Sequence, residues 1–302
     1  MIHSQIMKDI LDVHSEHYSL QSDYSVTMLL DPPRIVHLNK RHPIRPVDYD
    51  TNYPSLIGTA VHKYIEECLK KSESSKYRLE QRLFHTVYDR IISGAFDILD
   101  ENNDITDIKT CKTWKIIFDP KLEEWTKQQN IYALLLHKNG IEVNNLYIQA
   151  IYLDWIESMA LRDSNYPQQP DPVYKLTKWP YNVTDEYLHD RVNLMRQYEE
   201  TPDDELPACS SKDMWEDPTK FACFKTPKAA RAARVLDTLE DAITYIKTKG
   251  GYTKDSFIEI RHGRRKRCDK YCDVRQFCNH YQAYKKRMED SNLLEIIPYE
   301  QI

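Results

Sequence analysis

Three residues on two neighbouring segments of the chain have the side chains best suited to chemistry. Asp97 closes one segment of β-strand composition, and Asp107 and Lys109 lie in the next such segment. Because side chains two apart share a face of a strand, Asp107 and Lys109 point the same way. The polar stretch between the segments predicts a turn. A hairpin centred on Asn102 would place Asp97 directly opposite Asp107.

Two carboxylates in this arrangement repel each other. Opposed residues of an antiparallel pair have Cβ atoms about 4.5–5.5 Å apart, and like charges so placed destabilise the sheet. A cation between the carboxylates would remove the repulsion, and hard cations such as Mg²⁺ take oxygen ligands of this kind. The alternative is an acidic hairpin that faces solvent and binds nothing. The elements that surround the hairpin bear on this choice.

A helix is predicted before the hairpin, over residues 55–69. Val61, Ile65 and Leu69 recur at helical spacing, which is typical of an amphipathic helix. This helix carries His62. A single histidine on a helix is more often a hydrogen-bonded residue than a metal ligand, so the helix by itself does not identify a site.

A second helix follows the hairpin and carries two polar residues one turn apart, Gln128 and Tyr132. Asp119 and Pro120 are typical of a helix start, and Gly140 of a helix end. Residues 143–155 then read as a strand. The predicted order is αβββαβ, which favours one layered α/β core.

We therefore divide the chain into three predicted parts. They are an N-terminal region at 1–54, the α/β core at 55–160, and a helical C-terminal region at 161–302 that carries a group of cysteines.

The cysteines of the C-terminal region have the spacing of metal ligands. Cys268, Cys272 and Cys278 are close in sequence, which predicts a ligand cluster rather than a disulfide framework. A closed site needs a fourth ligand, and we favour Cys209, which lies in a break where a loop can reach back. The other candidates are Cys223, His262 and His280. Four thiolates suit structural zinc or an iron–sulfur cluster, and free thiols are the third alternative.

The charge of the chain limits how it could bind nucleic acid. The net charge of −5 argues against binding by bulk attraction and leaves local basic patches as candidates. One such run precedes the cysteines: Arg264, Arg265, Lys266 and Arg267. It could contact phosphates, or it could be a solvated surface. The sequence has neither a membrane-length apolar run nor a secretory signal pattern, so we expect a cytoplasmic protein without membrane contacts.

Four motifs that occur in a fixed order resemble the RecB-like branch of the PD-(D/E)XK nuclease superfamily. They cover roughly residues 55–155. The residues of the N-terminal region and the cysteines late in the sequence further resemble a bacteriophage group of that superfamily. The motifs are Gly58-x-x-x-His62, Gly94-Ala95-Phe96-Asp97, Asp107-Ile108-Lys109 and Gln128-x-x-x-Tyr132. The resemblance implies a restriction-endonuclease-like core, with a mixed sheet flanked by helices.

The resemblance also implies roles for individual residues. Asp97 and Asp107 would bind Mg²⁺ or Mn²⁺, together with His62 and the backbone carbonyl of Ile108. Lys109 would be the catalytic lysine.

Three further positions follow the family pattern less closely or in a supporting role. Gln128 and Tyr132 would support the site or contact the nucleic acid. Glu80 matches an acidic position of the family more loosely, and at Asp107 aspartate stands in the acidic position of the (D/E)-x-K motif, a variant that this branch tolerates.

The implied activity is hydrolysis of phosphodiester bonds in DNA. By resemblance, we expect an exonuclease that acts on single-stranded or duplex ends, with phage recombination or replication proteins as partners. The alternatives are a structure-selective or non-specific endonuclease, or a non-catalytic DNA-binding subunit. Several RecB-like nucleases hold a [4Fe–4S] cluster on C-terminal cysteines plus a distant one before the core. Here the distant cysteine would follow the core, because no cysteine precedes Cys68.

Overall fold

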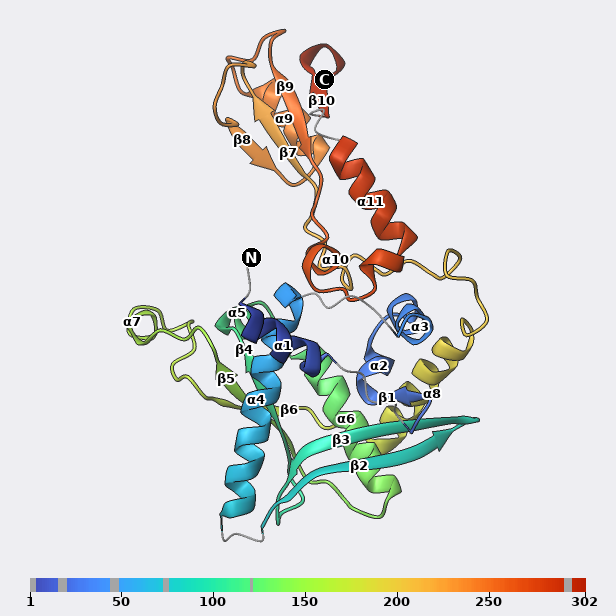
Figure 1. Ribbon diagram of the computed structural model, residues 1–302. Coiled ribbons are helices and arrows are strands. Elements are labelled where there is room, and N and C mark those ends of the chain that lie inside the picture. The colour runs from blue at the N-terminus through green and yellow to red at the C-terminus, as the bar shows by residue number, and fades with distance from the viewer. Residues whose placement is uncertain (1–3, 16–20, 44–48, 73–75, 120–121, 291–294) are drawn as a thin grey trace. The chain divides into compact units, whose positions relative to one another are not determined.

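The computed structural model describes residues 4–15, 21–43, 49–72, 76–119, 122–290 and 295–302. The chain forms two compact units, which are described separately (Figure 1). Unit 1 contains residues 1–32 and 43–200, and unit 2 contains residues 33–42 and 201–302. Each unit therefore contains one segment from the N-terminal region and a much longer one that follows it.

Unit 1 is a mixed α/β fold. Its helices are α1 (Gln5–His14), α2 (Val26–Leu30), α4 (Tyr49–Lys71), α5 (Thr113–Phe118), α6 (Glu123–Lys138), α7 (Glu157–Ala160) and α8 (Tyr181–Arg196). Its strands are β1 (Tyr24–Ser25), β2 (Arg78–Val87), β3 (Arg90–Leu99), β4 (Ile105–Cys111), β5 (Leu146–Tyr152) and β6 (Val173–Leu176). The predicted order αβββαβ is confirmed by α4, β2, β3, β4, α6 and β5, with the short α5 inserted.

The six strands form one mixed sheet. Strand β3 pairs antiparallel with β2 along one edge, and the other edge is shared by β1 and β4. β4 and β5 are parallel, and β6 is antiparallel to β5. On the shared edge β1 pairs with Ile92 and Ser93, whereas β4 pairs with Ile98 and Leu99. The stretch of β3 that contains Asp97 thus lies between the two pairings.

The predicted hairpin between β3 and β4 has the expected register. Ile98 pairs with Thr106, and Leu99 pairs with Ile105, so the hairpin is centred on Asn102. The Asp100 carboxylate fixes the turn, since its Oδ1 accepts hydrogen bonds from the backbone N–H groups of Asn102 and Asp104. This is the behaviour expected of aspartate in a turn.

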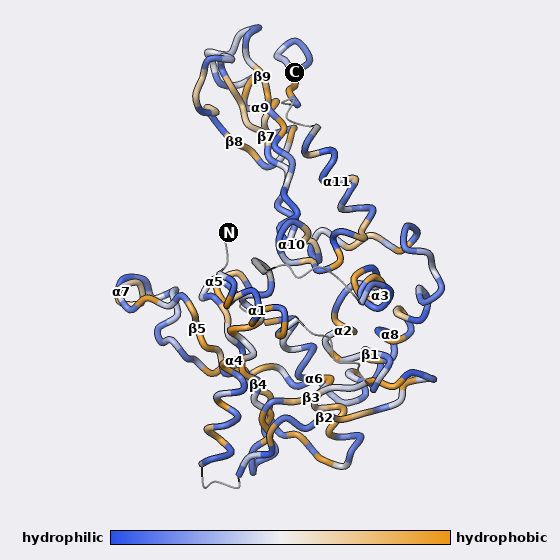
Figure 2. Tube along the Cα trace, in the orientation of Figure 1, coloured by the Kyte–Doolittle hydropathy of each residue, from blue (hydrophilic) through white to orange (hydrophobic). Residues whose placement is uncertain are grey.

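Helices cover both faces of the sheet at this point. Gly94 faces α6 and α2, because a Cβ built there would lie only 2.8 Å from Tyr132 and from Val26. Asp97 follows Gly94 by three residues, and residues an odd number apart on a strand face opposite sides of the sheet. Asp97 therefore points to the opposite face, toward His62 of α4. A glycine at 94 therefore lets α6 approach the sheet closely. The strands β3, β4 and β5 contain many hydrophobic residues (Figure 2), and Ile92, Phe96, Ile105 and Ile148 are buried.

Unit 1 extends beyond the core predicted at 55–160. The stretch after residue 160, read as a loop followed by a helix, contributes β6 to the sheet edge, and α8 packs against α6 and α2. These contacts place residues 161–200 with the sheet instead of with the cysteines. Pro120 of the predicted helix start lies outside the described residues, and α6 begins at Glu123.

The region predicted to be helical, residues 161–302, contains strands as well as helices, and four of these strands belong to unit 2. The helices of unit 2 are α3 (Pro33–Arg41), α9 (Leu239–Thr248), α10 (Lys266–Lys270) and α11 (Asn279–Asp290), with 3-10 turns η1 (Arg275–Phe277) and η2 (Tyr299–Gln301). It also contains an antiparallel sheet in the order β10-β9-β7-β8: β7 (Lys220–Phe224), β8 (Arg234–Leu236), β9 (Phe257–Arg261) and β10 (Ile296–Pro298). Three- to five-residue strands carry too little alternation to be recognised from sequence.

The sheet of unit 2 has its own small core. Cys223, Ala242, Ile246 and Ile258 are buried together between the sheet and α9. Thr238 caps the start of α9, because its side chain accepts a hydrogen bond from Asp241 N. In the described parts of both units, the helices lack the length and apolar character needed to cross a bilayer.

Candidate functional site

Three side chains from three elements of unit 1 meet beside the β3–β4 hairpin. His62 of α4, Glu80 of β2 and Asp97 of β3 each offer a ligand atom, and these atoms lie within 4.8 Å of one another. His62 Nδ1 is 3.4 Å from Asp97 Oδ2. A recess lined by these residues and by Ile108 has a volume of about 10 Å³, which is roughly the space of one water molecule.

Glu80 occupies this site through an unusual backbone conformation. Its φ is +44°, in the left-handed region that residues other than glycine seldom adopt. The neighbouring pairs Leu79–Ile98 and Gln81–Phe96 flank it, so Glu80 interrupts the β2–β3 pairing opposite Asp97. Strained conformations of this kind concentrate at functional sites, because the surrounding structure holds them in place.

The backbone of β4 departs from β3 at Asp97. The pairing of the two strands ends at Ile98 and Thr106, and the next N–H group, that of Ile108, donates to Asp97 Oδ2 at 2.8 Å. The Asp97 carboxylate thus takes the place of a backbone acceptor. This contact anchors the carboxylate at the point where the strands separate.

Asp107 and Lys109 lie beside this group. The Asp107 side chain is only 3% exposed, and its Oδ2 lies 2.7 Å from Lys109 Nζ. Among the described residues, that oxygen accepts no hydrogen bond of good geometry. Asp107 is outside the group formed by His62, Glu80 and Asp97. The structure therefore groups His62 and Asp97 with Glu80, the looser match, and places the Asp107–Lys109 pair on the neighbouring strand β4.

Gln128 and Tyr132 are buried on α6, where Gln128 Nε2 donates to the Tyr132 hydroxyl at 2.9 Å. Burial raises the pKa of Tyr132, and the negative charge of Asp107 raises it further. Tyr132 therefore stays a neutral phenol near Asp107. Arg82 of β2 also acts electrostatically on Tyr132, and its guanidinium donates to Ser93 Oγ at 3.2 Å. No sequence motif pointed to Arg82, which reaches the site only through the β2–β3 pairing.

The electrostatics of the group favour a cation. The pKa of Asp97 is raised to about 6, mainly by burial and then by the charge of Asp107. The hydrogen bond from the Ile108 N–H and the electrostatic effects of His62 and Lys109 act in the opposite direction and lower it. Glu80, Asp97 and Asp107 bring three carboxyl groups together. Carboxylate oxygens with one imidazole are a suitable donor set for a divalent ion, and the imidazole suits Mn²⁺ better than Mg²⁺.

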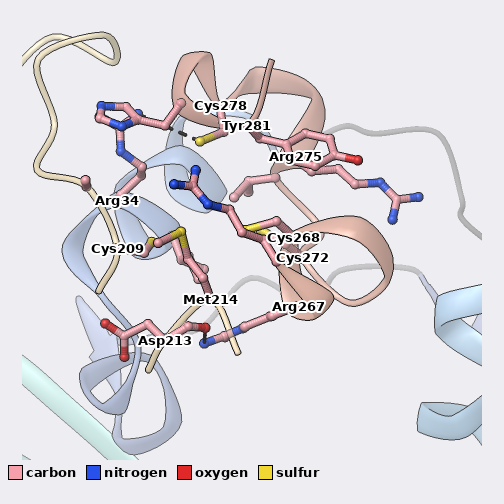
Figure 3. Close-up of a pocket in the computed structure, with 15 residues that line it drawn as sticks. Arg34, Cys209, Asp213, Met214, Arg267, Cys268, Cys272, Arg275, Cys278 and Tyr281 are labelled. Carbon is pink, nitrogen blue, oxygen red and sulfur yellow. Dashed lines mark hydrogen bonds between the residues drawn. The ribbon is translucent and has the colours of Figure 1, made fainter. Parts of the chain in front are cut away.

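The four predicted cysteine ligands line one cavity of unit 2, with a volume of about 50 Å³ (Figure 3). Cys209, the favoured fourth ligand, lies there with Cys268, Cys272 and Cys278. Burial and then the neighbouring thiols raise the pKa of Cys209 to about 12. Among the other candidates, Cys223 is buried in the sheet core, His262 pairs with Glu295, and His280 lines the same cavity.

The basic run before the cysteines is largely engaged inside unit 2. Arg265 pairs with Glu216 at 3.0 Å and Lys266 with Asp217 at 2.6 Å. Arg267 lines the cysteine cavity, with its guanidinium 5.9 Å from the Trp215 ring centroid. Arg264 is exposed. The structure thus gives three of these four residues partners within the protein.

Arg34 is a buried residue of the cysteine cavity that the sequence did not single out for this site. It lies on α3, is 1% exposed, and its Nη1 is 3.9 Å from Cys278 Sγ. About 170 residues separate it from Cys209, so spacing could not connect the two. Its only signal in the sequence was membership of a basic stretch.

Unit 1 thus brings carboxylates and a histidine together as a candidate divalent-cation site, at the point where β3 and β4 separate. Among solved structures, the chain is similar to the protein SSO0001, with a TM-score of 0.43 and 17% identity over 63% of this chain and 84% of that one. It is also similar to an alkaline exonuclease from Laribacter hongkongensis, with a TM-score of 0.32 and 13% identity over 57% of this chain and 90% of that one.

The same exonuclease in complex with dAMP gives a TM-score of 0.36 and 11% identity, over 58% of this chain and 92% of that one. At such low scores and identities the likeness does not by itself establish a shared fold or activity. Neither the family models nor the curated protein sequences include a match to the chain.

Protonation of Asp97 should make the stability of the metal-free protein depend on pH. An ordinary aspartate has a pKa of about 3.9 in the unfolded chain, whereas the folded value is about 6. The folded state therefore binds more protons between these values, and the free energy of unfolding should fall by about 2–3 kcal/mol as pH rises from 4 to 6.5. Urea titrations in EDTA, compared with Asp97→Asn, would measure this difference.

The matched control is Glu67→Gln, an exposed residue of the same helix that carries His62. It should follow the wild-type pH profile, whereas Asp97→Asn should lose the decline. Parallel profiles for wild type and Asp97→Asn would contradict the assignment of the raised pKa to Asp97.

Proposed function

We propose that the protein is a divalent-metal-dependent nuclease that hydrolyses phosphodiester bonds in DNA. The observation that carries the proposal is the meeting of His62, Glu80 and Asp97 within 4.8 Å, beside the Asp107–Lys109 pair. Three carboxyl groups gathered where β3 and β4 separate have no evident structural purpose, because repulsion between carboxylates costs stability. A metal site accounts for their arrangement.

His62, Glu80 and Asp97 would hold the ion, and Asp107 and the Ile108 carbonyl are the further ligands that the sequence motifs imply. When bound, a divalent cation would offset negative charge on the phosphate and lower the pKa of the attacking water. Mg²⁺ and Mn²⁺ are the candidates, because these divalent cations suit a donor set rich in oxygen.

The protein's own residues would position the reacting groups. Lys109 is held by Asp107 at 2.7 Å and keeps an ammonium group beside the carboxylates. From there it can hydrogen-bond the attacking water and balance the charge that develops on the phosphate. Tyr132, neutral and hydrogen-bonded to Gln128, adds a fixed phenol near Asp107.

Replacing either member of the Asp107–Lys109 pair should abolish cleavage. Lys109→Ala removes the ammonium group and Asp107→Ala removes the carboxylate, so each should lower the rate by at least about 100-fold. End-labelled single- and double-stranded DNA with Mg²⁺ or Mn²⁺ would measure the rates, and EDTA should stop cleavage by the wild type. Lys112→Ala, an exposed neighbour, is the control. Full activity of both variants, with the fold intact, would refute the proposal.

The same assay separates the kinds of nuclease. The motif with His62 and the Gln128–Tyr132 pair resemble those of exonucleases, so we propose cleavage from DNA ends in phage recombination or replication. Covalently closed DNA should then resist the enzyme while linear DNA is degraded. Cleavage of both substrates at similar rates would favour the endonuclease alternative.

For unit 2 we propose that Cys209, Cys268, Cys272 and Cys278 hold an iron–sulfur cluster. A single zinc ion binds thiolates at about 2.3 Å in a tetrahedron, which requires sulfurs roughly 3.8 Å apart. In the described chain, no three of these sulfurs lie within 4.8 Å of one another. A four-iron cluster places a separate iron under each thiolate and therefore accepts a wider spacing of the sulfurs.

The ligand set can be tested by substituting cysteines one at a time. Cys209→Ser and Cys272→Ser should remove the visible absorption and the bound iron and sulfide of anaerobically purified protein, because each removes one thiolate ligand. Cys223→Ala is the matched control, since Cys223 lies in the sheet core. Elemental analysis that finds one zinc per chain would support the zinc alternative. Retention of iron by Cys209→Ser would instead point to another fourth ligand, with His280 the nearest candidate.

A further inference from the structure

The strongest unexplained feature of unit 2 is the burial of the Arg34 side chain. It is 1% exposed, and its guanidinium donates to the backbone carbonyls of Asp203, Leu206 and Pro207. Nη1 also donates to Asn279 Oδ1 at 2.7 Å. These contacts engage Nε, Nη1 and Nη2, and each of the four acceptors is a neutral group.

A buried cation without an anionic partner is costly, because burial removes its hydration. The nearby carboxylates are engaged elsewhere: Asp203 pairs with Arg41 and His42, and Asp213 accepts from Ser210. Nη1 of Arg34 also lies 3.9 Å from Cys278 Sγ (Figure 3). Neutral thiols would leave the charge of Arg34 uncompensated.

A tetrathiolate centre in this cavity would carry a net charge of about −2, whether it holds one zinc or an oxidised four-iron cluster. Its negative charge would lie mainly on the sulfurs. We propose that Arg34 is the buried counter-charge of this centre and donates a hydrogen bond to the Cys278 thiolate. Arg34 would be a positioning residue, and the proposal rests on the cysteine centre proposed above.

Two consequences follow from removing this charge. Partners that hold a metal ligand in place typically affect metal affinity by about 10- to 100-fold, so Arg34→Gln should speed transfer of the metal to a chelator by about that factor. Reduction adds negative charge to an iron–sulfur cluster, so the loss of a nearby cation should move the reduction potential to more negative values. A residue that only packs the fold would not change the potential.

Arg41→Gln is a matched control, because Arg41 lies on the same helix and binds the same segment through Thr201 O and Asp203. Spectroelectrochemistry and chelator competition on the intact chain should show a large effect for Arg34→Gln and little for Arg41→Gln. Arg34→Lys keeps the charge and should restore most of the potential, which gives a test even if the glutamine variant folds poorly.

Equal potentials and release rates in Arg34→Gln and Arg41→Gln would overturn the proposal. So would an Arg34→Lys variant as altered as Arg34→Gln, because the charge would then not matter. A wild-type protein without metal would refute the cysteine centre itself, and a failure of that kind is distinct from a failure of Arg34.

A second inference comes from the exposed cations of unit 2. The basic loop, residues 225–234 between β7 and β8, contains four basic residues and no acidic one. Lys228, Arg231 and Arg234 are exposed, and none of them forms an ion pair with another described residue. They differ in this respect from the run at 264–267, most of which is engaged inside the unit.

The base of the basic loop is fixed at both ends. Ser256, which is 1% exposed, donates through Oγ to the Lys225 carbonyl at 2.9 Å, and Ala233 N donates to the Cys223 carbonyl at 2.8 Å. The cations are therefore presented from a well-defined hairpin end. We infer that this loop contacts the phosphate backbone of DNA, which deepens the nuclease function proposed above by naming a binding surface for its substrate.

The number of phosphate contacts can be measured from the way in which binding affinity depends on salt concentration. Each phosphate contact contributes about 0.7–0.9 to the slope of log affinity against log salt concentration. The triple variant Lys228→Gln, Arg231→Gln, Arg234→Gln should therefore lower the slope by about 2–3 and weaken binding at low salt. Fluorescence anisotropy of labelled DNA in EDTA, where cleavage is prevented, would measure both with the full chain.

The control removes the same charge elsewhere in the same sheet region: Lys247→Gln, Lys249→Gln, Lys254→Gln, all at exposed positions. It should keep the wild-type slope. Equal losses in both triple variants would show a general charge effect, and an unchanged slope in the loop variant would show a solvated loop, so either result overturns the inference. Absence of DNA binding by the wild type would instead count against the nuclease proposal.

Discussion

The separation of β4 from β3 at Asp97 is the constraint on which the candidate site of unit 1 depends. Where the pairing ends, the Ile108 N–H is satisfied by a carboxylate and not by a carbonyl, so a carboxyl group is held between the two strands. Glu80 reaches the same place only by adopting a positive φ. Both departures from regular pairing are local costs, and a bound cation would offset them by removing carboxylate repulsion.

Much of the core of unit 1 could be predicted because its signals are local. The hairpin register follows from strand alternation and from the turn chemistry of Asp100, and the structure confirms both. By contrast, β6 was missed, and β7 to β10 were expected to be helical, because such short strands are defined by their partners and not by their own pattern. Strands β9 and β10 pair with each other, but the whole of α11 separates them in the chain. A short stretch of sequence therefore cannot show that they are partners.

The candidate site shows the same division between local and distant information. The resemblance to RecB-like nucleases pointed to His62 and Asp97 together, and the structure places them 3.4 Å apart. Glu80 matched only loosely because its role depends on an interruption of strand pairing that sequence does not reveal. Arg34 lies 3.9 Å from Cys278, and both belong to unit 2. The sequence could not connect them, because residues 43–200 of unit 1 separate α3 from the rest of unit 2 in the chain.

The two units present opposite imbalances of charge, and this contrast bears on what each could bind. In unit 1, three carboxyl groups meet one lysine and one histidine, so the imbalance is negative and the pKa of Asp97 rises to about 6. In unit 2, the lining of the cysteine cavity contains Arg34, three other arginines and Asp213, so it carries more positive than negative charge while the thiols are neutral. A divalent cation would correct the first imbalance, and a dianionic metal–thiolate centre would correct the second. We therefore connect these charges with the two inorganic groups proposed above, a divalent cation in unit 1 and a metal–thiolate centre in unit 2.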